Sequence, residues 1–240
     1  MNTPLNQEEN NKQEQSVFRL SIQKNSLILA LFAIACTAIV GLINELTKDK
    51  IEEQAQLQLL NTLQSIIDPK RYDNDITKEC VNFSLGEHLD NTMQTAYIAR
   101  KADSVTAIAM TATAPNGYNG NIDIIVAVNM DSSISGVRVL SHKETPGLGD
   151  KIELRKSDWI LSFNGKKLLS DTDSRWAVAK DNGMFDQFTG ATITPRAVVQ
   201  AVKQTVIYFQ DNKQALLIRP NACNAEQEQI ITTSEASNDK

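Results

Sequence analysis

An apolar run without a single charged side chain, residues 27–43, constrains the fold of this chain more than any other feature. With Ser26 and Asn44 at its ends, the run approaches the ~20 residues that a helix needs to cross a bilayer. A helix in the core of a soluble protein would show a polar stripe, and this run has none. The sequence therefore predicts one membrane-spanning helix over residues 26–44.

Two other interpretations of the apolar run stay open. A cleaved signal peptide would need a shorter apolar region and a small-x-small exit. A lipoprotein signal would need a lipobox ending at Cys36, which residues 33–36 resemble only faintly. Ala33 stands where leucine is usual, and apolar sequence continues past Cys36. Both interpretations fit the run less well than a retained anchor does.

The basic residues around the run favour one orientation slightly. Three Lys or Arg residues precede it and two follow it closely, and positive side chains favour the cytoplasmic side. We therefore expect residues 1–25 to form a cytoplasmic tail. The first residues of that tail are rich in Asn, Gln and Glu, a composition typical of disorder.

Apolar residues recur at helical spacing beyond the run. They are Leu46, Ile51, Ala55, Leu59, Leu63 and Ile66. The pattern predicts an amphipathic stalk helix over residues 45–67, which Asp68-Pro69 would end. Its charged face is either a partner surface or an ordinary solvated surface.

From residue 94 onward the chain changes to short runs rich in Val, Ile, Thr and Tyr. These runs predict strands at 95–99, 104–113, 121–128, 134–139 and 176–179. Asn-Gly pairs at 116–117 and 119–120 supply turn signals between two of them.

Two helices complete the expected domain. One is predicted over 152–163 and the other over 194–210, with Thr194 as its N-cap and Pro195 as its first residue. We therefore expect an α+β fold, with a largely antiparallel sheet and flanking helices, over residues 68–223. The polar segment 224–240 is predicted to be a disordered tail.

Composition excludes several classes of function. A net charge of −5 without a basic block argues against nucleic acid as a partner. Only two histidines and no Cys-x-x-Cys are present, so zinc or iron–sulfur sites lack ligands at the required spacing. No dinucleotide fingerprint and no Walker loop occur. We expect no metal site and no catalytic residue in the isolated chain.

The segment 186–196 places two small residues, Gly190 and Ala191, among threonine hydroxyls directly before a helix start. The free N–H groups of a helix's first turn favour an anion such as phosphate. Such a loop suits a phosphate held close to a hydroxyl or joined to it as an ester. A capped helix after a tight turn explains the same residues, so the local pattern leaves both interpretations open.

The motif Asp186-x-x-Thr189-Gly190-Ala191-Thr192 resembles the flavinylation motif of the FMN-binding subunits of Rnf-type and sodium-pumping NADH:quinone oxidoreductase complexes. A second segment of that family, HKETPGLGD, is matched at residues 142–150. The resemblance runs from about Leu27 to about Cys223. It is strongest for the family of G subunits of Rnf complexes, called Rsx in enteric bacteria.

This resemblance implies that FMN is joined through its phosphate to Thr192, by a dedicated flavin transferase that uses FAD as donor. Asp186 would then serve recognition by the transferase. The remaining cofactor-binding candidates are Thr189, Gly190, Ala191, Thr194, Glu144, Thr145, Pro146, Gly147, Leu148 and Gly149. Among them, Pro146-Gly147 also fits a type II turn on its own chemistry.

The resemblance further implies a membrane-anchored flavoprotein subunit that relays electrons in an ion-translocating, ferredoxin:NAD-type complex. It implies location in the bacterial inner membrane, with the domain facing the periplasm. The expected partners are the other subunits, the flavin transferase and the lipid bilayer, and no nucleic acid. A membrane-tethered assembly or binding module without a cofactor is the alternative.

Two cysteines, Cys80 and Cys223, bracket the expected domain. A bridge between them is plausible in an oxidising compartment. Two unpaired thiols are equally consistent with the sequence, because it does not give the separation of their Cα atoms.

Overall fold

The computed structural model describes residues 5–86, 89 and 92–223, with side chains from residue 22 onward. The chain divides into two compact units, with the boundary between Ala55 and Gln56. The predicted tail at 224–240 lies outside the described residues.

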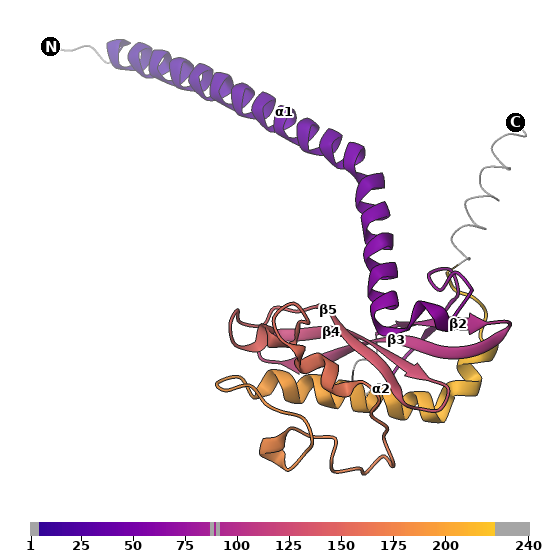
Figure 1. Ribbon diagram of the computed structural model, residues 1–240. Coiled ribbons are helices and arrows are strands. Elements are labelled where there is room, and N and C mark those ends of the chain that lie inside the picture. Colours follow the sequence, from indigo (N-terminus) through magenta and orange to yellow (C-terminus); the bar gives the residue numbers. More distant parts are fainter. Residues whose placement is uncertain (1–4, 87–88, 90–91, 224–240) are drawn as a thin grey trace, which may run out of the picture. The chain divides into compact units, whose positions relative to one another are not determined.

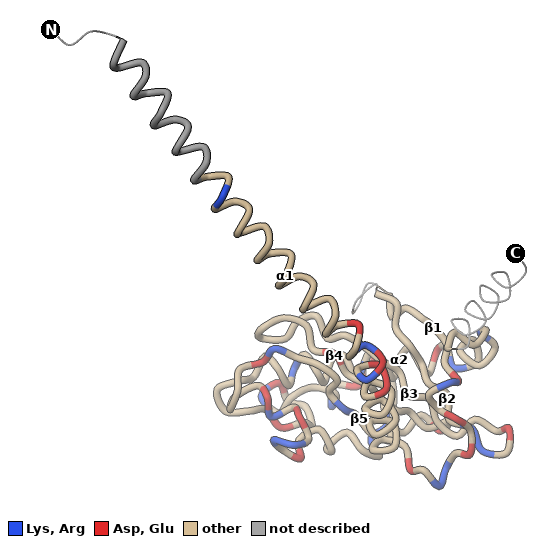
Figure 2. Tube along the Cα trace, turned by 90° about the horizontal axis from the view of Figure 1, so that it is seen from above, with Lys and Arg blue, Asp and Glu red and all other residues tan. Residues whose placement is uncertain are grey.

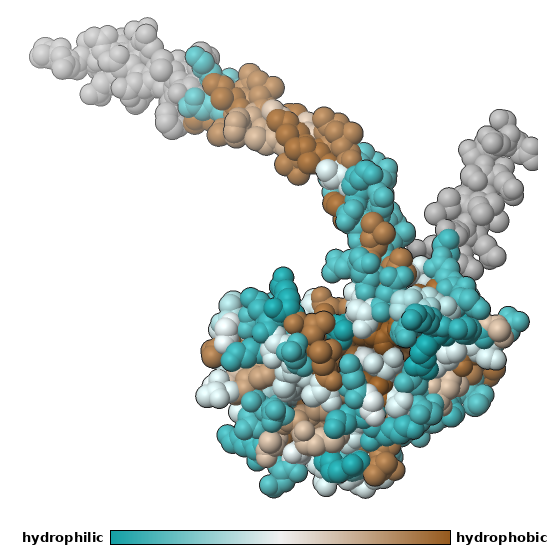
Figure 3. Space-filling model, viewed as in Figure 1, coloured by the Kyte–Doolittle hydropathy of each residue, from teal (hydrophilic) through white to brown (hydrophobic). Residues whose placement is uncertain are grey.

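The first unit is built from helix α1, which spans Leu5–Ile66 and continues into the second unit. Within the described residues, α1 is the one helix long and apolar enough to cross a membrane. Figure 2 shows its uncharged stretch, and Figure 3 shows the same stretch as a hydrophobic band.

Helix α1 extends beyond both ends of the apolar run. Residues 5–25 are helical where a disordered tail was expected, and the expected stalk continues the same helix without a break. Once a helix has nucleated, each added residue costs little, so a strong apolar helix extends into weaker flanking sequence. The helix ends at Ile66, just before Asp68, whose side chain accepts from Lys70 N at the 3₁₀ turn η1 (Pro69–Arg71).

The second unit contains a five-stranded antiparallel sheet in the order β1-β2-β3-β4-β5 (Figure 1). The strands are β1 (Cys80–Phe83), β2 (Gln94–Lys101), β3 (Ser104–Gly117), β4 (Gly120–Asn129) and β5 (Ile134–Ser141). Four of them were predicted with shorter limits, and β1 was not predicted. The predicted α+β class with an antiparallel sheet is confirmed.

The two faces of the sheet belong to two different cores. On β3, Ile108 and Met110 pack in the core that also contains α2 (Ile193–Ile218), whereas the smaller Ala107 and Ala109 face the end of α1. Successive residues of a strand point to opposite faces, so this alternation separates the cores. Figure 1 shows α2 running along its face of the sheet.

Side chains of strand β5 bind the main chain of the last turn of α1. Ser135 Oγ donates to Ile66 O at 2.6 Å, and Arg138 Nη2 donates to Ser65 O at 2.9 Å. A Cβ at Gly136 would lie 2.9 Å from Ile66 Cβ, so the helix approaches the strand as closely as glycine allows. These bonds satisfy carbonyls that a helix end leaves unpaired.

Two predicted elements differ in the structure. The helix predicted over 152–163 is replaced by two 3₁₀ helices, η2 (Gly149–Ile152) and η3 (Asp158–Phe163). Ser157 Oγ accepts from Trp159 N and starts the second one, which interrupts a continuous helix. The strand predicted over 176–179 is only an isolated bridge between Val178 and Phe185, followed by the 3₁₀ helix η4 (Ala179–Asp181).

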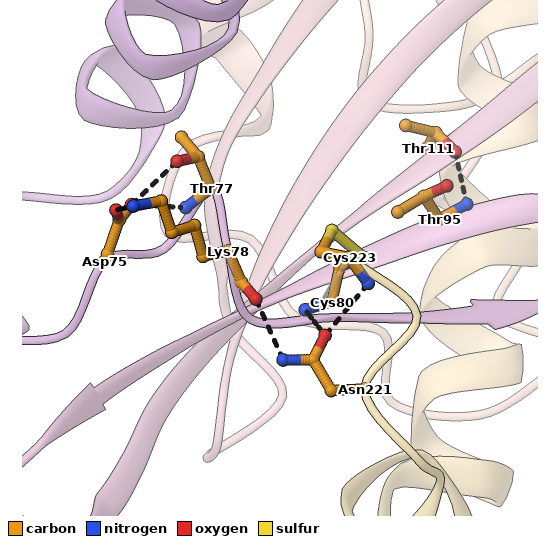
Figure 4. Close-up of a disulfide and its surroundings, with 8 residues drawn as sticks. All are labelled: Asp75, Thr77, Lys78, Cys80, Thr95, Thr111, Asn221 and Cys223. Carbon is orange, nitrogen blue, oxygen red and sulfur yellow. Dashed lines mark hydrogen bonds and ion pairs between the residues drawn. A yellow bond between two sulfur atoms is a disulfide. The ribbon is translucent and has the colours of Figure 1, made fainter. Parts of the chain in front are cut away.

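The C-terminal segment lies along the edge strand β1 (Figure 4). Cys80 and Cys223 are joined by a disulfide with a Cα–Cα separation of 5.4 Å, and Ala222 N donates to Cys80 O at 2.8 Å. The Asn221 side chain accepts from both cysteine amides and donates to Lys78 O. This segment therefore covers part of an edge that would otherwise be unpaired.

Candidate functional site

The loop before α2 is a tight turn held by an aromatic cluster. Ala191 N donates to Phe188 O at 3.1 Å, and Gly190 at the third turn position has φ +81°, as a type II turn requires. Trp159 Nε1 donates to Asp186 O at 2.7 Å, and the Trp159 ring packs edge-on against Phe188. The buried indole thus fixes the first part of the loop.

Helix α2 begins earlier than predicted. Thr192, and not Thr194, occupies the N-cap position, and Pro195 follows as the third helical residue. The hydroxyl of Thr194 is fully buried and donates to Glu144 Oε2, so it is not available to cap the helix. Thr192 is half-buried, and its side chain makes no capping hydrogen bond.

A second turn of the same kind lies at residues 145–148. Leu148 N and Gly149 N both donate to Thr145 O at 3.1 Å, and Gly147 has φ +78°. The type II turn predicted from Pro146-Gly147 is present. Pro fixes φ at the second position of the turn, and Gly accepts the positive φ at the third position.

These two turns and the β3–β4 hairpin enclose a pocket of about 280 Å³. Its lining residues are Tyr118, Glu144, Thr145, Leu148, Gly149, Gly190, Ala191, Thr192, Ile193 and Thr194. The fold therefore brings the segment around residue 145 to the segment around residue 192. Segments this far apart in sequence share a pocket because both lie at the same end of the sheet and α2.

Sequence reasoning named eight of the ten lining residues and missed Tyr118 and Ile193. Tyr118 was visible only as an aromatic residue between two Asn-Gly pairs, and Ile193 as an exposed apolar residue at a helix start. Of the remaining candidates, Pro146, Gly147 and Thr189 belong to the turns without lining the pocket, and Asp186 is exposed.

The wall of the pocket is organised around the carboxylate of Glu144, which is only 5% exposed. Asn119 N donates to its Oε1 at 3.1 Å, and the Thr194 hydroxyl donates to its Oε2. A Cβ at Gly149 would lie 2.8 Å from Oε2, and one at Gly117 would lie 2.9 Å from Oε1. A buried carboxylate needs such donors, and the two glycines lie close against its oxygens. The side chain of Glu144 is therefore held in one position.

His142, directly after β5, connects Glu144 to Glu153. Its Nδ1 accepts from Glu144 N at 3.0 Å, and its Nε2 lies 2.7 Å from Glu153 Oε1. A hydrogen bond from the Arg155 side chain, helped by one from His142, lowers the pKa of Glu153 to about 2. Lys143 is exposed, and its carbonyl accepts from Asn119 Nδ2 at 2.8 Å.

The two tryptophans belong to the core. Trp159 is 8% exposed and Trp176 is 3% exposed, and both contact Phe163 within one aromatic cluster. Among residues 22–86, 89 and 92–223, no group of three or more His, Cys, Asp or Glu side chains could hold a metal ion.

Comparison with known proteins identifies two family regions in the chain. Residues 117–207 match the FMN-binding domain, and residues 11–66 match the RnfG N-terminal region. The first match contains both turns and the whole lining of the pocket, and the second ends with α1.

Several relatives match nearly the full chain, and each is the G subunit of an ion-translocating oxidoreductase complex. The protein from Shewanella piezotolerans is 50% identical over 209 residues, which cover 87% of this chain and 99% of the relative. The protein from Vibrio atlanticus is 52% identical over 206 residues, 86% of this chain and 99% of the relative. The Vibrio cholerae protein is 47% identical over 206 residues, which also cover 86% of this chain and 99% of the relative.

Proposed function

Because this chain belongs to the family of G subunits of ion-translocating oxidoreductase complexes and contains an FMN-binding domain, we propose that it relays electrons through one FMN joined covalently to Thr192. The observation that carries this proposal is the position of Thr192. Thr192 lines the pocket at the N-cap of a long helix, and its side chain makes no capping hydrogen bond.

The start of α2 suits a phosphate ester on that hydroxyl. The first N–H groups of an α-helix have no partner within the helix, and the helix dipole favours negative charge there. The neighbouring Gly190 has no Cβ, and one built there would touch only Leu148 Cδ2, at 3.7 Å. The main chain before Thr192 can therefore approach a phosphate closely.

The pocket has room and chemistry for part of a flavin nucleotide. At about 280 Å³ it is near the lower end of the volumes typical of small-molecule sites. Three of its apolar side chains, Tyr118, Leu148 and Ile193, are 68, 42 and 46% exposed, so they can cover an aromatic ring at the mouth. Bound FMN would supply the electron-carrying chemistry, and the protein would supply position and electrostatics.

Attachment requires a separate enzyme, because an unaided threonine hydroxyl is a weak nucleophile. In the proposed step, Thr192 Oγ attacks the FMN-side phosphorus of FAD and forms a new P–O bond. The bond from that phosphorus to the bridging oxygen breaks, and AMP leaves with that oxygen. The hydroxyl proton passes to a base of the flavin transferase, and Asp186, exposed beside the loop, is the recognition residue.

The proposed location is the inner membrane, with the domain in the periplasm. The uncharged stretch of α1 supports a membrane anchor. The disulfide between Cys80 and Cys223 supports an oxidising compartment for the domain. The proposed partners are the other subunits of a ferredoxin:NAD-type complex, the flavin transferase and the lipid bilayer.

Mass spectrometry of the tryptic peptide 181–196 tests the attachment. Protein made in a host with the flavin transferase should carry a mass increase equal to FMN less one water, localised to Thr192. Thr192→Ala should abolish the increase, whereas Thr189→Ala, a matched change in the same loop, should keep at least part of it. An unmodified peptide from a host with proven transferase activity would refute the attachment and favour an assembly module without a cofactor.

A further inference from the structure

The proposed function gives no role to His142, although its side chain is only 9% exposed and touches the wall of the pocket. We propose that His142 is a positioning residue whose neutral imidazole holds the main chain of Glu144, and with it the carboxylate that shapes the flavin pocket. This inference rests on the proposed function, because Glu144 lines the pocket that contains Thr192.

The contacts of the ring specify one tautomer. The amide of Glu144 can only donate, so His142 Nδ1, 3.0 Å away, is the acceptor. The proton therefore sits on Nε2 and is donated to Glu153 Oε1, 2.7 Å away. A carboxylate on one nitrogen and an amide N–H on the other orient the imidazole from both sides.

The position of Glu144 depends on this ring because the carboxylate and the main-chain amide of Glu144 are held by different partners. The carboxylate is fixed by Asn119 N and the Thr194 hydroxyl, which belong to the β3–β4 hairpin and to α2. The main-chain amide is fixed by His142 Nδ1. The ring thus completes a series of contacts from Glu153 to the start of α2, where Thr192 lies.

Two substitutions isolate the acceptor at Nδ1. In His142→Asn, the side-chain oxygen can accept from the amide two residues later, as in an Asx turn. In His142→Gln, the amide group lies one bond further out, so it suits Glu153 and leaves the Glu144 amide unpaired. The two variants are a matched pair of neutral amides.

The first readout needs no flavin. Amide hydrogen exchange of the full chain with isotope-labelled glutamate, in detergent micelles, is followed by NMR at one fixed pH for the wild type and both variants. The Glu144 amide signal is identified by its loss in Glu144→Gln. We expect the Glu144 amide of His142→Gln to exchange about fivefold faster than that of the wild type, the ratio for the loss of one hydrogen bond of about 1 kcal/mol. The Glu144 amide of His142→Asn should exchange at the wild-type rate.

The second readout uses the flavinylated chain. The midpoint potential of the flavin should shift in His142→Gln and should stay at the wild-type value in His142→Asn. Equal exchange rates of the Glu144 amide in His142→Gln and in the wild type, or equal shifts of the potential in the two variants, would overturn the positioning role. Failure of flavinylation would be visible in the mass and would refute the proposed function alone, because the amide readout is independent of the flavin.

Discussion

Removal of the bridge between Cys80 and Cys223 should destabilise the domain strongly. The bridge joins residues 143 positions apart. By the chain-entropy relation, a loop of this length removes about 5 kcal/mol of conformational freedom from the unfolded chain at 25 °C. Native domains are stable by only about 5–15 kcal/mol, so the double variant C80S/C223S should lose a large share of its stability.

Urea unfolding of the full chain in detergent measures this loss. Trp159 and Trp176 are buried in the domain core, so their fluorescence reports its unfolding. With a urea slope of about 2 kcal/mol/M, the expected loss lowers the midpoint by about 2.5 M. Chemical reduction of the wild type should reproduce the shift.

The matched control is C36S. Cys36 is the free cysteine of the described chain and lies in α1, outside the bridge. C36S should therefore unfold at the wild-type midpoint. A loss below about 1 kcal/mol, with the broken bridge proven by mass, would refute the loop-length reasoning.

Two further predictions concern the pocket wall and its support. Thr194→Val leaves Glu144 Oε2 without its buried donor and should cost about 1.5–3 kcal/mol in urea unfolding. Thr205→Val is the matched control, since this equally buried hydroxyl bonds only its own helix, and equal losses would contradict the reasoning. The pKa of Glu153 is lowered from 4.5 to about 2, first by the hydrogen bond from Arg155, so its contribution to stability is complete above about pH 4.5 and is lost as the pH falls toward 2. Glu153→Gln should flatten that part of the stability-against-pH curve, and a curve parallel to the wild type would count against the assignment.

Much of the fold was predictable because it follows local rules. Four strands carry β-branched residues between turn signals, and the turn at Pro146-Gly147 follows from the φ preferences of those two residues. Strand β1 was missed because it is short and lies at an edge of the sheet. The disulfide to Cys223 brings the C-terminal segment against it, and a contact between residues so far apart leaves no local sequence pattern.

The errors at the site have a common cause, which is competition from other hydrogen-bond partners. Thr194 has the chemistry of an N-cap, but Glu144 binds its hydroxyl and Thr192 takes the cap position. The predicted helix over 152–163 breaks where Ser157 caps a new turn. The local propensity of residues predicts secondary structure only weakly, and tertiary contacts routinely override it.

By itself, the sequence determined the apolar segment that suits a bilayer, the α+β class and the two loop segments of the site, because these depend on residue type and spacing alone. Only the tertiary structure decided that the two segments line one pocket, that Tyr118 and Ile193 stand at its mouth, and that His142 and Glu153 support Glu144. Those facts depend on contacts between residues far apart in the chain, and such contacts are set by how the sheet and α2 pack together.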